Sequence, residues 1–475
     1  MFNLDLDHSN PLGTQRNVRY LQYISAFCAG ILQVSQFVNL AWGSPTVPLL
    51  LAKDSPIGRP LTYDEVSWML SIIYAGIIIG SVLLLLLFDR LGPKSILMVG
   101  AALTIISWIL LGLAKSFAML IIGRVIAGIG DGISFPCISI YICEIASKDI
   151  RGRLGAIPVL IGIFGNVFIF GAGPYLGYQT LIISCAIFPS IFLILFFFMP
   201  NSPYYLIRRG RKNEAKTNLM RLLGSNAPFE VEISLKEIED TVRRETEGET
   251  LMQLLLSPNF RKSLLIVFVA HNIINFCGLT FISPYLQVIL ASSGISLSKE
   301  LTSVIYGLVQ VPAVILSGIL MDKVGRKPLF CVSSLGASVT LIIEGVYIYH
   351  QDVKLGNLSF VPVVCLTLYK FFISFGILHL PYFIVGELFT TSTKKVGSFI
   401  VTAYSSIVVF GSIKIFGSMF SSWGFDTLCW IFGSVCFIGV LFSLFMLPET
   451  KGRSFDEIQN NLSSKNTSPP EQINQ

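Results

Sequence analysis

Long apolar runs constrain this chain more than any other feature of its sequence. A helix of about 20 mostly apolar residues is long enough to cross the hydrocarbon core of a bilayer. Within lipid, only helices and closed barrels satisfy their own backbone hydrogen bonds. The sequence contains twelve such runs, at roughly 20–42, 66–88, 95–114, 117–143, 154–176, 180–199, 263–291, 302–321, 329–349, 360–386, 396–421 and 428–447. We therefore predict an all-α membrane protein with twelve transmembrane helices.

The composition supports a membrane protein and argues against several other classes. Hydrophobic residues make up 53% of the chain and charged residues 13%, whereas soluble domains carry about 25% charged residues. The nine cysteines are scattered through apolar stretches without a paired motif, which is typical of small buried side chains rather than of a metal or disulfide site. We expect no metal, no cofactor and no nucleic-acid partner, because membrane topology explains the net charge of +6.

The spacing of the runs divides the chain into four parts. Six runs come first, a charged segment follows, and six further runs complete the series. We predict an N-terminal six-helix bundle in 1–200, a cytoplasmic linker with short helices in 201–262, a C-terminal six-helix bundle in 263–447 and a cytoplasmic tail in 448–475. The polar first nineteen residues are followed by a run too long for the apolar part of a signal peptide. That run is therefore expected to be the first spanning helix.

Basic residues in the loops predict the orientation. Loops on the side of the two termini contain 26 Lys and Arg residues, the other loops contain five, and three lie within spans. Cytoplasmic loops of membrane proteins are enriched in Lys and Arg. Both termini are therefore expected in the cytoplasm. The acceptor Asn357, in an Asn-Leu-Ser sequence, then lies in an extracellular loop and is predicted to carry a glycan.

Features at matching positions in the two halves indicate an internal repeat. An Asp-containing turn follows the second span of each half, a Glu with a basic residue seven positions later follows the fourth, and a Pro-rich tetrapeptide follows the sixth. In the first and second halves these are 89–94 and 322–327, Glu144 with Arg151 and Glu387 with Lys394, and 200–203 and 448–451. Such repeats are common in transporters.

Several of these motifs resemble those of the sugar porter family of the major facilitator superfamily. Residues 318–327 match its pattern G-x-x-x-D-x-x-G-R-K, and 448–458 (PETKGRSFDEI) resemble the segment that closes its last helix. Lys414 and the run 204–207 resemble the insect facilitated trehalose transporter-like branch. The resemblance implies two pseudo-symmetric six-helix bundles around a midplane cavity. It also implies alternating access without covalent chemistry.

The charged turns predict a gate on the cytoplasmic side. A carboxylate at the membrane edge can hold nearby cations when the halves close and release them when the halves open; the alternative is a static charged loop. In the first half the pattern is degraded, with Leu85 and Pro93 replacing Gly and Arg. The predicted gate residues are Asp322, Arg326, Glu387 and Lys394 in the second half and Asp89, Arg90, Glu144 and Arg151 in the first.

The cargo site departs from the family pattern. Sugar porters carry amide side chains that bond sugar hydroxyls, and several of those positions are apolar here, including Val159 and Ile274. The remaining polar or aromatic candidates lie at family contact positions or on span 1. They are Gln310, Asn275, Thr280, Tyr382, Gln33 and Gln36.

Charged residues at membrane depth leave alternatives open. Arg124 and Asp131 on span 4 either pair with other helices or, for Asp131, couple a proton to transport. Glu344 and Lys370 are placed where they can pair with each other. Lys414 either reaches the outer surface or lines the cavity. Span 1 has no acidic residue, which favours uniport.

The resulting prediction is facilitated uniport of a sugar, trehalose or a hexose, across the plasma membrane. Alternatives are a carrier of another small organic solute, a proton-coupled symporter and a non-transporting nutrient sensor, against which the short tail 448–475 argues. An enzyme is not expected, because the sequence has no Gly-rich phosphate loop, metal cluster or catalytic triad. The expected partners are the solute and the lipid bilayer, with no obligate protein partner.

Overall fold

The computed structural model describes seven stretches of the chain, and every element within them is helical. They are 20–147, 150–224, 228–246, 257–293, 297–350, 360–389 and 394–449. Within these stretches some side chains lie outside the described residues. They are those of Asp89, 228–230, 244–246, Asp322, Tyr382, Phe383, Gly386, Glu387, Lys394 and Lys395.

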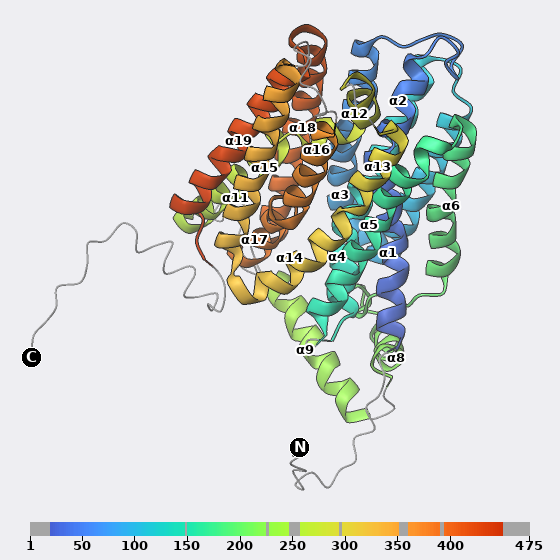
Figure 1. Ribbon diagram of the computed structural model, residues 1–475. Helices are drawn as coiled ribbons and strands as arrows, with labels where there is room; N and C mark the ends of the chain where they lie inside the picture. Colours follow the sequence, from blue (N-terminus) through green and yellow to red (C-terminus); the bar gives the residue numbers. More distant parts are fainter. Residues whose placement is uncertain are drawn as a thin grey trace, which may run out of the picture.

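The first half of the chain folds into a group of apolar helices (Figure 1). Its members are α1 (Tyr20–Ala41), α2 (Gly43–Leu51), α3 (Tyr63–Gly112), α4 (Phe117–Ile145), α5 (Arg151–Gly171), the 3₁₀ turn η1 (Gly173–Tyr175) and α6 (Tyr178–Phe197). Helix α3 contains two predicted spans, which separate at Gly92, a residue with non-helical dihedral angles. Short polar helices follow: α7 (Pro203–Arg208), α8 (Lys212–Leu223) and α9 (Pro228–Thr246).

The second half contains more interrupted helices. They are α11 (Pro258–Phe276), α12 (Leu279–Ser292), α13 (Lys299–Leu308), α14 (Gln310–Val324), α15 (Arg326–Tyr349), α16 (Val361–Phe372), the π-helix η2 (Ile373–Ile377), α17 (Leu380–Leu388), α18 (Lys394–Trp423) and α19 (Phe425–Phe445). Within the described residues, eleven segments are long and apolar enough to cross a membrane, and the shorter apolar segment Val361–Ile377 is the twelfth. The prediction of twelve transmembrane helices is confirmed.

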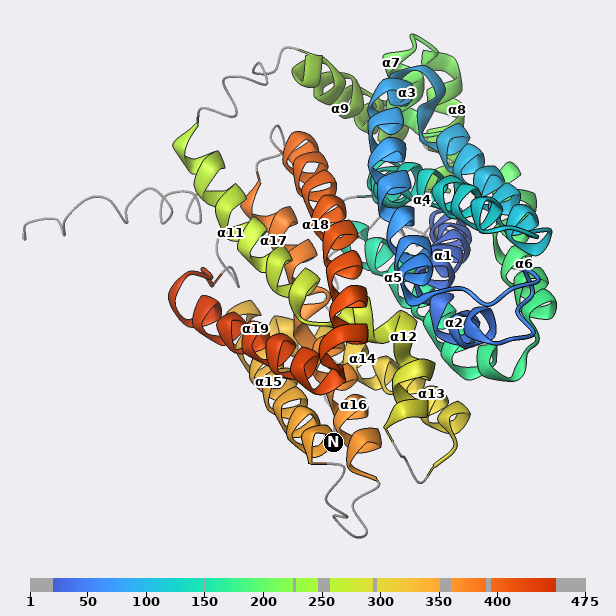
Figure 2. The same ribbon diagram turned by 90° about the horizontal axis from the view of Figure 1, so that it is seen from above.

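The helices form two groups that meet along a few elements. Figure 2 shows α1–α6 on one side and α11–α19 on the other, with α12 and α13 next to α2 and α5. The contacts between the groups include those of α18 with α3, α12 with α2 and α13 with α5. Breaks within spanning segments occur at the α1/α2, α11/α12, α13/α14 and η2/α17 junctions. Interrupted helices are typical of transporter binding sites, because the freed backbone lines a protected cavity.

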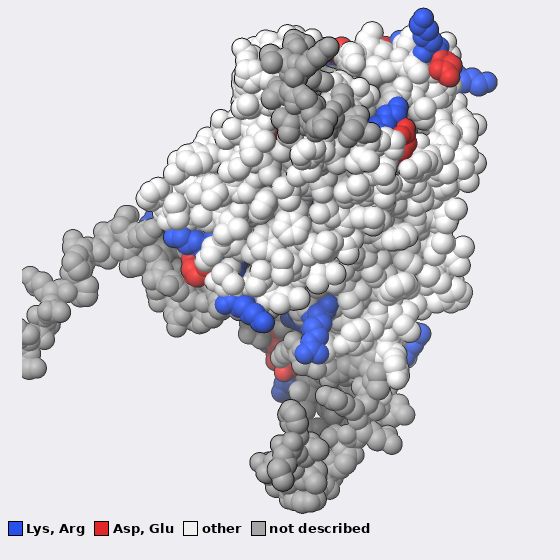
Figure 3. All heavy atoms as spheres, viewed as in Figure 1, with Lys and Arg blue, Asp and Glu red and all other residues white. Residues whose placement is uncertain are grey.

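The molecule has two ends, which we name by their elements. The linker face is the end at which α7, α8 and α9 lie, and the opposite face is the end at which α2 and the first turn of α3 lie (Figure 1). In Figure 3 charged side chains gather toward these ends, and the surface between them is largely uncharged. Lipid tails accept such a surface without loss of hydrogen bonds.

Two turns at the linker face have the same construction, as the sequence repeat predicts. Gly92 and Gly325 have φ angles of +73° and +102°, a region that side chains with a Cβ avoid. Two residues after each glycine a lysine caps the final turn of a neighbouring helix. Lys94 Nζ donates to the carbonyl oxygen of Phe197 at 2.7 Å, and Lys327 Nζ donates to that of Leu444 at 2.8 Å. The repeat thus extends to individual hydrogen bonds.

The glycines of α4 bring it close to α3. A Cβ at Gly128 would collide with the carbonyl oxygen of Ile73, and one at Gly132 would collide with that of Ile77. On α3, Gly76 and Gly80 face α4 in the same way. Small residues allow membrane helices to pack backbone to backbone, and dispersion contacts replace the missing hydrophobic effect.

Candidate functional site

Three buried glutamine side chains lie near the boundary between the two groups of helices. Gln33 and Gln36 of α1 are 4% and 2% exposed, and Gln310 of α14 is fully buried. The Nε2 atom of each has no hydrogen-bond partner, and neither has Oε1 of Gln36. A buried polar atom without a partner is costly and rare in folded proteins. These three predicted cargo residues therefore carry buried donor groups that no described residue uses.

One face of α5 connects these amides. A Cβ at Gly162 would lie 2.6 Å from Cγ of Gln33, so Gln33 packs directly on this helix. Four residues later, Asn166 Nδ2 donates to Oε1 of Gln310 at 3.2 Å. Residues four apart share a helix face, so Gly162, Asn166 and Phe170 lie in a line along α5. This face of α5 therefore contacts α1 of the first half and α14 of the second.

Two further predicted cargo residues are engaged within their own half. Asn275 Nδ2 donates to Oγ of Ser405 at 2.9 Å, and the Ser405 hydroxyl donates back to Oδ1 of Asn275 at 3.2 Å. Thr280 Oγ1 donates to the carbonyl oxygen of Asn275 at 3.2 Å, across the break between α11 and α12. The structure therefore uses Asn275 to join α11 to α18. The side chain of Tyr382 lies outside the described residues.

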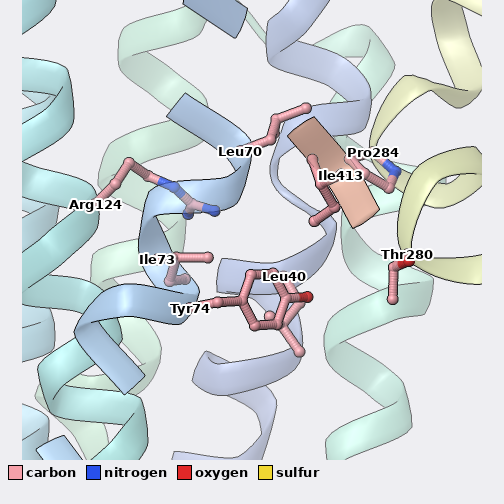
Figure 4. A pocket seen from close by; sticks show the side chains of 8 residues that line it. All are labelled: Leu40, Leu70, Ile73, Tyr74, Arg124, Thr280, Pro284 and Ile413. Atoms are coloured by element: carbon pink, nitrogen blue, oxygen red, sulfur yellow. The ribbon is translucent and has the colours of Figure 1, made fainter. Parts of the chain in front are cut away.

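A pocket between the halves contains one predicted cargo residue, Thr280. It holds about 220 Å³ of space not filled by atoms, and this space includes open solvent. Figure 4 shows its lining side chains, which come from α1, α3, α4, α12 and α18. The lining residues are Leu40, Leu70, Ile73, Tyr74, Arg124, Thr280, Pro284 and Ile413.

Arg124 and Asp131 both contact α1, as the pairing alternative predicts. Arg124 Nη1 donates to the carbonyl oxygen of Asn39 at 2.9 Å, and its guanidinium lies 5.4 Å from the ring centre of Trp42. Asn39 Nδ2 donates to the two carboxylate oxygens of Asp131 at 3.2 and 3.0 Å. Asn39 thus links both charged residues of α4 to α1, close to the break between α1 and α2.

Lys370 is not paired with Glu344, which corrects one of the sequence-based alternatives. Its Nζ lies 5.2 Å from the ring centre of Tyr306 and 5.8 Å from that of Phe170. The carboxylate oxygens of Glu344 are buried without a hydrogen-bond partner. The two residues lie on neighbouring helices, but Lys370 points toward the first half of the chain, where Phe170 lies.

Charged residues of the predicted gate form contacts within each half at the linker face. Glu144 Oε1 pairs with Arg208 Nη1 of α7 at 3.3 Å. The backbone N–H groups of Arg326 and Lys327 donate to the two carboxylate oxygens of Glu449, each at 3.1 Å. Glu449 thereby caps the first turn of α15, where the helix dipole favours an anion.

The remaining gate residues contribute less to the described contacts. Arg151 Nη2 reaches the carbonyl oxygen of Ala146 at 3.5 Å, and Arg90 is exposed. The side chains of the other four lie outside the described residues; they are Asp89, Asp322, Glu387 and Lys394. The acceptor Asn357 also lies outside the described residues. The gate therefore remains a prediction.

An ion pair that the sequence did not predict joins the halves at the opposite face. Lys414 Nζ lies 2.5 Å from Oδ1 of Asp64, donates to Oγ of Ser67 at 3.0 Å and lies 4.4 Å from the ring centre of Trp68. Lys414 therefore reaches the opposite face, where it meets the exposed carboxylate of Asp64, and it is not among the residues that line the central pocket.

Sequence reasoning missed four residues that contact the predicted ones: Asn166, Arg208, Glu449 and Asp64. Two of them carried a signal. Glu449 belongs to the repeated segment 448–451, and Arg208 lies in the basic stretch after the sixth span. Asn166 and Asp64 carry no motif, because their partners come from distant parts of the chain.

Comparisons with known proteins agree with this architecture. The sequence profile of the sugar (and other) transporter family matches residues 27–462. The facilitated trehalose transporter Tret1 of Bombyx mori is 28% identical over 458 residues, which cover 95% of this chain and 88% of that protein. Tret1 of Culex quinquefasciatus is 28% identical over 441 residues, which cover 90% and 85%.

Solved structures share the fold. The inward open conformation of the xylose transporter XylE from E. coli superposes with a TM-score of 0.72 at 20% identity, covering 94% of this chain and 99% of that one. Its partially occluded inward open conformation gives a TM-score of 0.75 at 20% identity, covering 92% and 99%. The profile match extends over nearly all described helices, including the buried amides, the repeated turns and the capped α15. This chain, a multi-pass membrane protein with the major facilitator fold, therefore belongs to the sugar (and other) transporter family, whose members are transporters and not enzymes.

Proposed function

We propose that this protein carries a sugar across the plasma membrane by facilitated diffusion, as a uniporter. The observation that carries the proposal is the set of buried amides whose Nε2 atoms have no hydrogen-bond partner, Gln33, Gln36 and Gln310, on helices from both halves. Sugar hydroxyls both donate and accept hydrogen bonds, so they satisfy such groups without charge. A solute held by both halves is also the one whose binding can couple to their relative motion.

The relatives narrow the choice of cargo. The relatives cited above are named as facilitated trehalose transporters, so trehalose and the hexoses are the first sugars to test. The apolar residues at Ile274 and Val159, together with the pairing of Asn275 with Ser405, support a site that differs from the common hexose pattern. Another small organic solute is the alternative cargo for the same fold.

Transport proceeds by alternating access. In the proposed cycle, the two halves rock around the buried amides and close first one face and then the other. Several contacts join the halves near the opposite face: Lys414 with Asp64, Trp68 with Phe410 at 6.0 Å between ring centres, and Tyr63 with Phe420 at 6.2 Å. These contacts support a state that is closed at this face.

The linker face carries the second gate of the proposed cycle. Two contacts hold each half together internally. They are the ion pair of Glu144 with Arg208 and the hydrogen bonds of Glu449 to the start of α15. Asp322, Arg326, Glu387 and Lys394, with Asp89, Arg90 and Arg151, then act between the halves when this face closes. The basic residues of the linker and loops support a cytoplasmic position of this face, and hence of both termini.

A proton-coupled symporter is the second candidate, and Asp131 is the observation that favours it. Its carboxylate is buried and accepts both hydrogen bonds from Asn39 of α1, a helix that also carries Gln33 and Gln36. A proton taken up at Asp131 would weaken this bond and change the packing of α1. Arg124 contacts the same Asn39 and keeps a cation near the carboxylate, which supports a fixed structural carboxylate instead.

Uptake into liposomes tests the proposal. The purified full-length protein is reconstituted, and the initial rates of labelled trehalose, glucose and a non-sugar solute are measured with empty liposomes as control. Uniport predicts saturable uptake of a sugar that stops when the inner and outer concentrations are equal. Accumulation above the outer concentration that disappears with a proton uncoupler supports the symporter. Absence of uptake for every sugar in the panel contradicts the proposed function.

A further inference from the structure

Lys370 of α16 is a buried lysine, and no carboxylate among the described residues forms an ion pair with it. It is 2% exposed, and its described contacts are the rings of Tyr306 and Phe170. Within the described part of the chain it makes no hydrogen bond and no ion pair, and Glu344 on the neighbouring α15 does not reach it. The faces of two rings attract an ammonium but replace only part of its lost hydration.

The position of Lys370 places it beside the proposed cargo site. Phe170 lies one helical turn from Asn166, which bonds Gln310, and Tyr306 lies four residues before Gln310, across the junction of α13 and α14. The rings of Phe170 and Tyr306 also contact each other, with centres 5.2 Å apart. Residues four apart on a helix are neighbours, about 5–6 Å between Cβ atoms. Lys370 therefore contacts two residues that lie close in the chain to the partners of the Asn166–Gln310 hydrogen bond.

The unpaired groups of this region are mainly donors. The Nε2 atoms of Gln33, Gln36 and Gln310 have no partner, whereas Oε1 of Gln36 is the one unpaired buried acceptor among the same three amides. Each hydroxyl of a neutral sugar offers one O–H donor and two acceptor lone pairs. A carboxylate offers only acceptor lone pairs and a negative charge. Its hydrogen bonds to an ammonium and to amide N–H groups are stronger than neutral ones.

We propose that Lys370 is a specificity-determining residue and that the preferred cargo is a monosaccharide bearing a carboxylate, a hexuronate. This inference rests on the proposed function, because it assigns a charge to the solute bound at the same amides. The carboxylate lies next to Nζ of Lys370, and the ring hydroxyls take up the amides of Gln310 and of α1. The carboxylate thereby neutralises the charge of Lys370.

Competition in the reconstituted full-length protein tests the inference. Glucuronate, glucuronamide and glucose are compared as inhibitors of labelled sugar uptake, since glucuronamide keeps the shape of glucuronate and lacks its charge. Loss of one charge-assisted hydrogen bond weakens binding by about 10- to 100-fold. We expect glucuronate to inhibit at concentrations lower by this factor than either neutral compound. Equal inhibition by glucuronate and glucuronamide overturns the inference.

A substitution assigns the preference to Lys370. In Lys370→Met the advantage of glucuronate over glucuronamide should fall to near one, and in Lys370→Arg it should be retained in part. Lys115→Met, in an exposed loop, is the matched control and should keep the preference of the original protein. The comparison within the original protein remains decisive if the Met variant does not fold. Uptake of neutral sugar without a preference for glucuronate rejects the inference and leaves the proposed function intact, whereas absence of all sugar uptake rejects both.

Discussion

The ammonium of Lys414 on α18 lies 2.5 Å from the carboxylate of Asp64 in the first turn of α3, and this pair joins the two halves of the protein at the opposite face. The side chain of Asp64 is 72% exposed and that of Lys414 25%. Exposed pairs contribute about 0–1 kcal/mol, so the pair adds little to the stability of the fold. In the proposed cycle the pair can form only while this face is closed.

Lys414→Met should therefore open this face without unfolding the protein. The loss of an exposed pair shifts the equilibrium by about two- to fivefold toward the open state. Labelling of Leu70→Cys, which lines the pocket below this face, by an impermeant thiol reagent measures the shift, with the exposed Cys143 replaced. Lys299→Met, whose partner Glu300 lies on the same helix, should not change labelling. The double exchange Lys414→Asp with Asp64→Lys should return the labelling to the level of the original protein. Equal labelling in all variants contradicts a gate at this face.

Glu449→Ala should destabilise the second half at the linker face. The change removes the cap from the first turn of α15 and leaves the N–H groups of Arg326 and Lys327 without their acceptor. Loss of a helix cap reduces the free energy of unfolding by about 1 kcal/mol. Thermal unfolding in detergent measures this loss. Asn201→Ala is the matched control, because Asn201 stands at the position of Glu449 in the first-half repeat. Pro93 at the corresponding turn has no N–H group to cap. An equal loss of stability in both variants would show that Glu449 has no special role.

Gln310→Ala should weaken cargo binding. It removes a group that is free for a solute and also leaves Asn166 Nδ2 without its acceptor. An unpaired buried polar group costs about 1–3 kcal/mol, which corresponds to about 5- to 150-fold in the dissociation constant. Gln287→Ala is the control, because Gln287 is buried in α12 and donates to a backbone carbonyl away from the amides. Unchanged affinity in Gln310→Ala contradicts the assigned site.

Asp131→Asn should leave the energetics of transport unchanged if the protein is a uniporter. The amide keeps the size of the carboxylate and one acceptor for Asn39, so α1 stays in place. Initial uptake should be insensitive to a proton uncoupler in both forms, and the final inner concentration should not exceed the outer one. Accumulation in the original protein that Asp131→Asn abolishes identifies Asp131 as the coupling residue and rejects uniport.

Glycosylation of Asn357 should show which loops of the protein lie on the extracellular side of the membrane. The predicted extracellular loop contains this acceptor, whereas Asn461 and Asn466 also stand in acceptor sequences but in the predicted cytoplasmic tail. Treatment with a glycosidase should increase gel mobility in the original protein and have no effect in Asn357→Gln. A glycan on Asn461 together with an unmodified Asn357 reverses the predicted topology.

Much of the fold follows from local properties of the chain. The length of the apolar runs is a property of contiguous residues, so all twelve spans were predicted and only their ends shifted; α11, for example, begins at Pro258. The turns at Gly92 and Gly325 were predicted from their motifs, because the backbone conformation depends on the glycine itself. The breaks at α1/α2 and η2/α17 were not predicted, since they depend on the neighbouring helices.

The site was predicted less completely, and the reason is physical. Whether an amide is free for a solute depends on the groups around it, and those come from other helices. Asn275 and Gln310 both carry a side-chain amide. The amide of Asn275 is hydrogen-bonded to Ser405, whereas Nε2 of Gln310 has no hydrogen-bond partner. Lys370 and Lys414 are both lysines within a predicted span, yet among the described residues only Lys414 has a carboxylate partner.

The sequence by itself therefore determined that this chain spans the membrane as two related sets of six helices and belongs among the sugar porters, because hydrophobic length and repeated motifs act along the chain. Only the tertiary structure decided which polar side chains remain unpaired and which charges meet. Lys414 and Asp64 are separated by 350 residues, and their contact exists because α18 packs against α3. Buried polar groups depend on partners from distant segments, so their state is a property of the packed helices and not of any one of them.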